Sequence, residues 1–492
     1  MASRSPLLCL ILCCIALDVG SALPLAATAD ASRLPGSPAL SIKRASPLDL
    51  GLKPTVDRLR GGAGAAVAAP AKPRGLHLGP IALVASFTIC NLLNYVDRGL
   101  VNGVLPTLGE DFHVSKTHLG ALTGAFMGGY CALCPIFAYL SNIFPPFLLM
   151  GIGLTVWEIS AVMAASAPTF QWLLAARVLS GVGEASFQAI APPFLDDAAT
   201  DSNRGSMLAI FFCAIPVGTA LGYVFGGYME KLYSWRQGFY VLAALMAPLT
   251  LTCFFVNNTI KKPPAPAVDA AKPGIIDLFR NKVWLAATLG YSAWTFTIGA
   301  FAVWGPTLLH SVHKLPLDVA DLHFGAITVA MGILGTAVGG VLLDKITKKG
   351  AKPQLEDKKE DLGGGGGGIV TMSLMLCSAL TAVAMPFLFL AFSNAPLSVF
   401  YFGMVLGEFF LFSTTAPLNG VFLWCVSAEQ RSMSLAVANL VIHLLGDVLS
   451  PVIAGWLWTR TGSGTTAMTL VSAWLGWGVL LWALGAAASR NA

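Results

Sequence analysis

The chain has 492 residues, of which 55% are hydrophobic and only 11% are charged. Soluble domains carry about 25% charged residues, so this composition indicates a polytopic membrane protein and excludes an ordinary soluble one. The formal net charge of +5 is spread over the N-terminal region and the breaks between apolar segments. We therefore expect no nucleic-acid partner.

The first 77 residues differ in composition from the rest of the chain. Arg4 precedes an apolar run from Leu7 to Leu17, and small residues follow it, so residues 1–22 are predicted to be a signal peptide. Residues 23–77 are basic and rich in Pro, Ala, Ser and Gly, which predicts disorder. This order resembles the two-part leader of proteins imported into the plastids of algae with secondary plastids, which would place the protein in a plastid envelope or another endomembrane. A simple secretory signal and an uncleaved anchor are the alternatives.

Apolar runs long enough to cross a bilayer fill the remainder of the chain. They divide six and six around a basic break at residues 258–281, which predicts six-helix bundles at 78–257 and 282–488. A second break at 344–368 ends in glycines and is predicted to be a flexible loop, and residues 489–492 form a tail. The twelve predicted spans are 78–106, 118–140, 144–166, 169–195, 205–229, 236–257, 282–310, 319–343, 369–392, 397–425, 429–459 and 465–488.

The distribution of basic residues predicts the orientation of the spans. Sixteen Lys and Arg residues lie in the even-numbered breaks and flanks, against five in the odd-numbered breaks. Positive residues are enriched on the cytosol-like side of a membrane. Both ends of the membrane body are therefore expected on that side.

Ionised residues lie inside the first and fourth predicted spans. The stretch N-L-L-N-Y-V-D-R-G-L-V-N-G-V-L-P places Asp97 and Arg98 inside the first span. A charge near the centre of a membrane helix costs roughly 2.5 to 3.5 kcal/mol, so such residues usually pair and face a polar cavity. In the fourth span, Arg177 and Glu184 are seven residues apart, so one helix face presents both.

Several motifs resemble those of a known transporter family. Six plus six helices around a basic break resemble the major facilitator superfamily. Four stretches narrow the resemblance to its Spinster family: N-Y-V-D-R-G-L-V-N-G-V-L-P in the first span, G-V-G-E-A-S-F-Q-A-I-A-P in the fourth, F-F-C-A-I-P-V-G-T-A-L-G-Y-V-F-G in the fifth and H-L-L-G-D-V-L-S-P in the eleventh. The resemblance implies an all-α membrane protein that transports lysophospholipids or sphingoid lipids and their phosphates. It also assigns the family's charged cluster to Asp97, Arg98 and Glu184.

The residue types fit these roles. The planar guanidinium of Arg98 suits a phosphate, and Asp97 or Glu184 is a candidate to take up a proton. The alternative for this cluster is a structural ion-pair network between the first and fourth spans. Likewise, His443 and Asp447 form either part of the site or a structural pair. The remaining candidate substrate-binding or proton-binding residues are Asn94, Tyr95, Arg177, Trp304 and Glu408.

Glycines in the fifth span, including Gly218, Gly222 and Gly226, recur every four residues. This spacing permits close helix contact, so we predict a packing role for them. In contrast, the stretch A-Y-L-S-N-I-F-P-P-F at 138–147 has no charge where the superfamily usually has G-x-L-x-D-R, although Asp344 and Lys345 are retained after the eighth span. The usual charges help to hold one conformation of the transporter closed, so their absence at 138–147 leaves the equilibrium between conformations unpredicted.

Together these features predict a secondary transporter that works by alternating access, with proton coupling as a further hypothesis. Its expected partners are an amphipathic lipid substrate and membrane lipids. We expect no enzymatic activity, cofactor or metal, and the glycine run at 363–368 lacks the Lys-Ser/Thr ending of a phosphate-binding loop. The alternatives are a carrier of small organic or inorganic anions and a transport-inactive receptor or scaffold.

Overall fold

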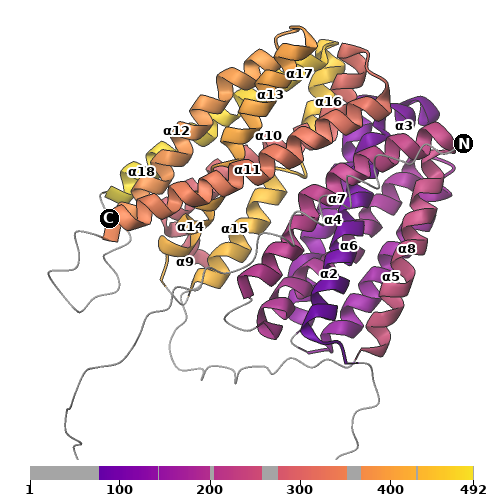
Figure 1. Ribbon diagram of the computed structural model, residues 1–492, viewed down its shortest axis with the longest axis horizontal. Helices are drawn as coiled ribbons and strands as arrows, with labels where there is room; N and C mark the ends of the chain where they lie inside the picture. The colour runs from indigo at the N-terminus through magenta and orange to yellow at the C-terminus, as the bar shows by residue number, and fades with distance from the viewer. Residues whose placement is uncertain are drawn as a thin grey trace, which may run out of the picture. The chain divides into compact units, whose positions relative to one another are not determined.

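The computed structural model describes residues 77–141, 143–199, 204–256, 275–351, 367–427 and 430–490. The elements in these ranges are α-helices, which confirms the predicted all-α membrane fold (Figure 1). The predicted leader segments 1–22 and 23–77 lie almost wholly outside the described residues.

Seven helices make up the N-terminal half. Six of them correspond to the first six predicted spans, and the short α3 lies mostly beyond the predicted end of the first span at residue 106. The helices are α2 (Pro80–Gly103), α3 (Leu105–Phe112), α4 (Lys116–Leu140), α5 (Pro146–Ala165), α6 (Phe170–Ala198), α7 (Arg204–Leu232) and α8 (Trp235–Phe255).

Ten helices make up the C-terminal half, and three of its spans consist of two helices each. The helices are α9 (Ile275–Arg280), α10 (Lys282–His313), α11 (Leu317–Ala351), α12 (Gly367–Ala391), α13 (Leu397–Phe412), α14 (Thr415–Trp424), α15 (Arg431–Leu445), α16 (Ser450–Thr461), α17 (Gly464–Ala473) and α18 (Leu475–Arg490). All twelve predicted runs are therefore helical, and the paired helices mark interruptions within spans.

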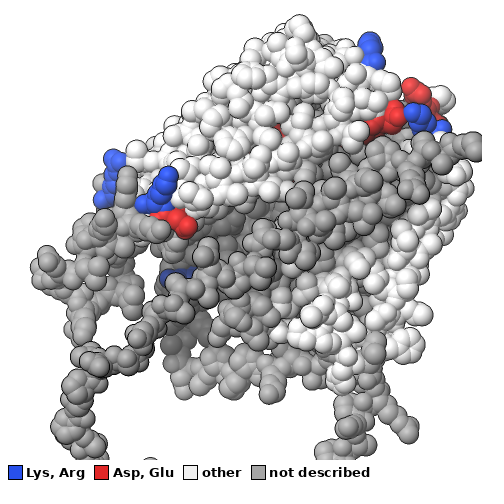
Figure 2. All heavy atoms as spheres, in the orientation of Figure 1, with Lys and Arg blue, Asp and Glu red and all other residues white. Residues whose placement is uncertain are grey.

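Within the described ranges, ten helical segments are long and apolar enough to cross a membrane. Helices α6 and α10 have 29 and 32 residues, which is sufficient length, but they are less apolar than those ten. On the face in Figure 2, charged side chains gather near helix ends, and a broad uncharged surface lies between them. This distribution is typical of a surface that faces lipid.

Two predicted loops contain helical residues. The loop predicted at 344–368 begins too early, because α11 continues to Ala351. Lys and Asp are compatible with a helix that leaves the membrane, and no proline intervenes before residue 353. Similarly, the short α9 occupies residues 275–280 of the predicted central break. Residue 281 precedes α10, residues 367 and 368 begin α12, and the other residues of both breaks lie outside the described ranges.

The eleventh span was predicted as one helix, and this prediction is wrong in one respect. Its helix ends at Leu445 and resumes at Ser450, so Asp447 lies in a non-helical turn. Gly446 begins the turn, and the N–H of Val448 donates to the carbonyl of His443 over 3.1 Å. Interrupted helices of this kind often form binding sites in transporters.

Small residues hold α7 against α2. A Cβ at Gly218 would lie 2.7 Å from the carbonyl oxygen of Leu92, and one at Gly226 would lie 2.9 Å from that of Leu100. Between them, a Cβ at Gly222 would overlap the carbonyl of Val96. The predicted packing role of these glycines is therefore confirmed.

The two halves contact each other near the turns that join α3 to α4, α10 to α11 and α16 to α17, which we call the outer side. The Nδ2 of Asn102 and the hydroxyl of Tyr223 both donate to the carbonyl of Ala302, over 3.3 and 2.7 Å. Lys231 forms a 2.7 Å ion pair with Asp318 across the same boundary. These contacts connect α2 and α7 of the first half to α10 and α11 of the second.

Glycines bring α4 and α16 together on the same side. A Cβ at Gly120 would overlap the carbonyl of Pro451, and one at Gly455 would overlap the carbonyl of Lys116. A Cβ at Gly124 would lie 2.7 Å from the carbonyl oxygen of Val448. The outer ends of the two halves are thus closely packed.

Candidate functional site

Two ion pairs connect α2 to α6. In the first, Nη1 of Arg177 lies 2.7 Å from Oδ2 of Asp97, and both side chains are almost fully buried. The hydroxyl of Ser180 also donates to this carboxylate, over 3.4 Å. Because each buried charge has a partner, this pair agrees with the structural interpretation of the cluster.

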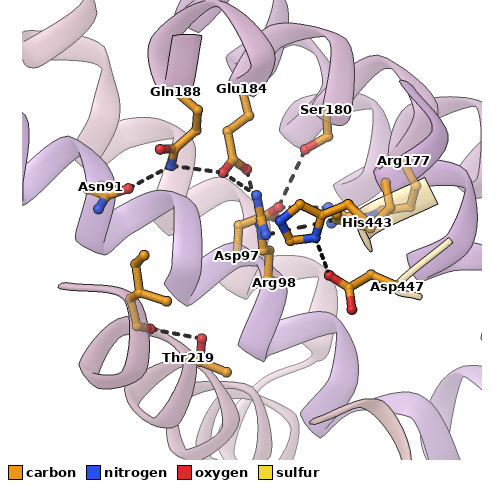
Figure 3. Close-up of polar contacts among 12 residues, drawn as sticks. Asn91, Asp97, Arg98, Arg177, Ser180, Glu184, Gln188, Thr219, His443 and Asp447 are labelled. Carbon is orange, nitrogen blue, oxygen red and sulfur yellow. Dashed lines mark hydrogen bonds and ion pairs between the residues drawn. The ribbon is translucent and has the colours of Figure 1, made fainter. Parts of the chain in front are cut away.

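The second ion pair is partly open. Nη2 and Nε of Arg98 donate to the two carboxylate oxygens of Glu184, over 2.5 and 3.3 Å (Figure 3). Glu184 is fully buried, whereas the Arg98 side chain is 19% exposed. The Arg98 side chain is therefore partly exposed, whereas its carboxylate partner is not.

Aromatic rings surround the Arg98 guanidinium. Its Cζ lies 4.4 Å from the ring centre of Tyr95, 4.6 Å from that of Phe126 and 5.7 Å from that of Tyr130. The guanidinium Cζ of Arg177 lies 4.9 Å from the ring centre of Phe126. Phe126 thus contacts both arginines, and cation–π attraction contributes to holding them in place.

Amides extend the polar network along α2 and α6. The Nδ2 group of Asn91 donates to the carbonyl of Phe211, and its Oδ1 accepts from Gln188 over 2.7 Å. Gln188 also donates to Glu184 over 3.3 Å. The side chain of Asn94 is fully buried, and neither its nitrogen nor its oxygen has a partner among the described residues.

The C-terminal half contributes His443 and Asp447. Nδ1 of His443 lies 2.6 Å from Oδ2 of Asp447, and the two side chains are 27% and 21% exposed. Helix α15, which carries His443, contacts α4, which carries Phe126 and Tyr130. A Cβ at Gly299 of α10 would lie 2.6 Å from Oδ1 of Asp447, which fixes the carboxylate against that helix.

This arrangement combines a permanent positive charge, aromatic faces and a pair of hydrogen-bonding groups from the opposite half. Arg98 can bind an anionic group through a planar fork of donors, and neighbouring rings can contact an apolar chain. No cluster of His, Cys, Asp or Glu suited to a metal ion occurs within the described ranges. These groups could therefore bind a ligand that has both an anionic and an apolar part.

Comparisons with known proteins identify the family. The model of the Major Facilitator Superfamily matches residues 87–355, and that of the Organic Anion Transporter Polypeptide family matches residues 394–462. "Probable sphingolipid transporter spinster homolog 3" of Arabidopsis thaliana is 33% identical over 460 residues, which cover 83% of this chain and 85% of that protein. The chain belongs to the Spinster family. It is thus a multi-pass membrane transporter of the major facilitator superfamily.

Other Spinster proteins and several solved structures are also similar to this chain. "Protein spinster homolog 1" of Homo sapiens is 30% identical, with 78% of this chain and 74% of that protein covered. The structure of a bacterial homolog to the human lysosomal transporter Spinster, inward-facing and unoccupied, has a TM-score of 0.68 at 18% identity and covers 84% of this chain and 98% of that chain. A D-xylose-proton symporter has a TM-score of 0.60 at 16% identity, over 83% and 96% of the two chains. At these identities the two structures show the fold alone.

Two residues predicted for the Spinster site lie elsewhere. Trp304 is fully buried, and its Nε1 donates to the carbonyl of Pro451 over 2.9 Å, which joins α10 to α16. Trp304 also lines a pocket of about 750 Å³ on the outer side. Glu408 is buried in α13, where its Oε1 accepts from Thr328 of α11 over 3.2 Å. Neither residue contacts the Arg98 cluster.

Sequence reasoning missed several members of the site in this Spinster protein. Gln188 lies four residues after Glu184, and Asn91 lies seven before Arg98, so helical spacing could have identified both. Phe126 and Tyr130 are in α4, and no pattern within that apolar span distinguishes them from ordinary packing residues. Outside this site, Asp321 in α11 was also missed, although it is an ionisable residue within a predicted span.

Proposed function

We propose that this protein moves an amphipathic, phosphate-bearing lipid across its membrane by alternating access. Lysophospholipids and sphingoid lipid phosphates are the substrate types. The observation that carries the proposal is the partly exposed Arg98 guanidinium, which is enclosed by aromatic rings and paired with a buried carboxylate. The names of the plant relatives, which refer to sphingolipid transport, agree with this substrate class.

Recognition of the headgroup would depend on Arg98. Its guanidinium carries five donors, and only some of them are directed at Glu184. A phosphate that approaches from the open side could accept the others while the Glu184 pair holds the guanidinium in orientation. Tyr95 and Tyr130 would then lie beside the lipid backbone or the first part of its acyl chain.

Coupling between the halves would depend on His443 and Asp447. They are partly exposed, belong to the C-terminal half and sit at the interruption of the eleventh span. A headgroup bound to Arg98 could therefore contact both halves at once. A substrate that contacts both halves would change the stability of the inward-open state relative to the outward-open state. Alternating access requires such a change.

The deciding experiment is lipid uptake by proteoliposomes that contain the full chain. Hydrogen bonds to a charged group contribute about 1.5 to 3 kcal/mol, so Arg98→Ala should lower uptake of a lysophospholipid by about 10- to 100-fold. Arg236→Ala is the matched control, because Arg236 is an exposed arginine that pairs with Asp111 on the outer side. It should retain uptake close to that of the unchanged protein.

Two other outcomes would contradict the proposal. Flux of small phosphate or organic anions without lipid flux would favour an anion carrier that uses the same arginine. Lipid binding without any movement across the membrane would favour a receptor or scaffold on this fold.

We propose further that residues 1–22 and 23–77 direct the protein to a plastid envelope or another endomembrane. The support is the order of the two segments, an apolar run followed by a basic tract rich in Ala and Ser. A fluorescent protein fused to the C-terminus, with and without residues 1–77, tests this. An unchanged location after deletion would contradict it.

A further inference from the structure

Asp321 lies at the boundary between the two halves, near the first turn of α11. Its side chain is fully buried, and neither carboxylate oxygen has a hydrogen-bond partner among the described residues. An ionised carboxylate without partners in apolar surroundings is strongly unfavourable, so such a group holds a proton instead.

Two glycines of the other half lie against the Asp321 side chain. A Cβ at Gly227 of α7 would lie 2.6 Å from its Oδ2, and one at Gly103 of α2 would lie 3.1 Å from the same atom. Glycine at these two positions leaves room for the carboxyl group. Movement of α11 away from α2 and α7 on the outer side would therefore expose Asp321 to water.

The charged and titratable groups on the surrounding helices have other partners, so none neutralises Asp321. Lys231, the nearest cation on α7, pairs with Asp318, one turn before Asp321. Other groups on these helices that have partners are Asp97 with Arg177, Arg98 with Glu184, Tyr223 with Ala302, Glu230 with Trp235, His310 with Leu315, His313 with the Phe400 ring, His323 with Tyr401 and Glu408 with Thr328.

We propose that Asp321 is a proton-binding residue of the transport cycle: it holds a proton while the outer side is closed and releases it to water when the halves separate there. The carboxylic acid O–H bond breaks, the proton passes to water, and the carboxylate remains on α11. Because the closed state binds one proton more than the open state, a higher pH favours outer opening. This inference rests on the proposed alternating access and assigns proton coupling to Asp321 rather than to Asp97 or Glu184, which are paired with arginines.

The first test detects the proton directly and requires no lipid substrate. Infrared spectra of the full-length protein in liposomes should contain the carbonyl band of a protonated carboxylic acid, which Asp321→Asn removes. Asp318→Asn, one turn away and partly exposed, should leave this band unchanged. If the band remains in Asp321→Asn, or if Glu408→Gln removes it instead, the assignment is wrong.

The second test measures the outer opening. Spectroscopic labels carried by unnatural amino acids at Glu110 and Thr459, which line the outer pocket from opposite halves, avoid the native cysteines. If outer opening releases one proton, each increase of one pH unit should raise the ratio of open to closed protein by up to about tenfold. The Asp321→Asn variant should show no pH dependence and should stay closed on the outer side. The Asp318→Asn variant should retain the pH dependence. A wild-type pH response in Asp321→Asn would overturn the proposal, whereas absence of lipid flux would affect only the proposed function.

Discussion

The buried ion pair between Asp97 and Arg177 predicts a large loss in the free energy of unfolding when one partner is replaced. Replacing Asp97 with asparagine removes the negative charge and leaves the guanidinium of Arg177 buried at 3% exposure without an ionic partner. Breaking one side of a buried pair costs about 3 to 5 kcal/mol. The contact of Arg177 with the Phe126 ring, at 4.9 Å, is present before and after the substitution, so it does not reduce this loss.

The assay is reversible unfolding in mixed micelles, compared between paired variants. Asp318→Asn is the control, because Asp318 and Lys231 form an ion pair whose side chains are 29% and 60% exposed. An exposed pair contributes at most about 1 kcal/mol. The double variant Asp97→Asn with Arg177→Met should be less destabilised than the sum of its single variants, since the orphaned charge is gone. A loss for Asp97→Asn no larger than that for Asp318→Asn would refute the reasoning.

Three further variants separate packing from recognition. Gly222→Ala should lower the free energy of unfolding by about 1 to 3 kcal/mol, because the added Cβ would overlap the backbone of α2. Gly128→Ala is its control: the added Cβ meets nothing within 4 Å, so this variant should unfold like the unchanged protein. Asp447→Asn should change the unfolding free energy by less than about 1 kcal/mol, given its partial exposure and that of His443, while proteoliposome uptake of lipid falls. Trp304→Phe should cost about 1 to 3 kcal/mol in unfolding through the lost hydrogen bond, with no change in the lipid KM.

The twelve spans and the charged residues on α2 and α6 could be predicted because they depend on local properties of the sequence. Apolar run length identifies a span, and helical spacing places Arg177 and Glu184 on one face. Which carboxylate pairs with which arginine could not be predicted, because it depends on the rotation and depth of two separate helices. The structure separates the cluster into a closed pair, Asp97 with Arg177, and a partly open pair, Arg98 with Glu184.

Interruptions within spans and contacts between halves were not predictable from hydropathy. The turn at Gly446 interrupts the eleventh span within an otherwise helical pattern, and it depends on the close approach of Thr295 in α10. The aromatic faces around Arg98 come partly from α4, which is distant in sequence. The burial of Asp321 against Gly103 and Gly227 likewise requires two helices of the other half.

Recognition of a phosphate by Arg98 is tested most directly by comparing two lipids that differ only in that group. Uptake of a sphingoid phosphate and of the corresponding sphingoid base should be measured in the same proteoliposomes, with the unchanged protein and with Arg98→Ala. The account predicts that the unchanged protein prefers the phosphate and that Arg98→Ala loses this preference. Equal uptake of both lipids by the unchanged protein, or an undiminished preference in Arg98→Ala, would contradict it.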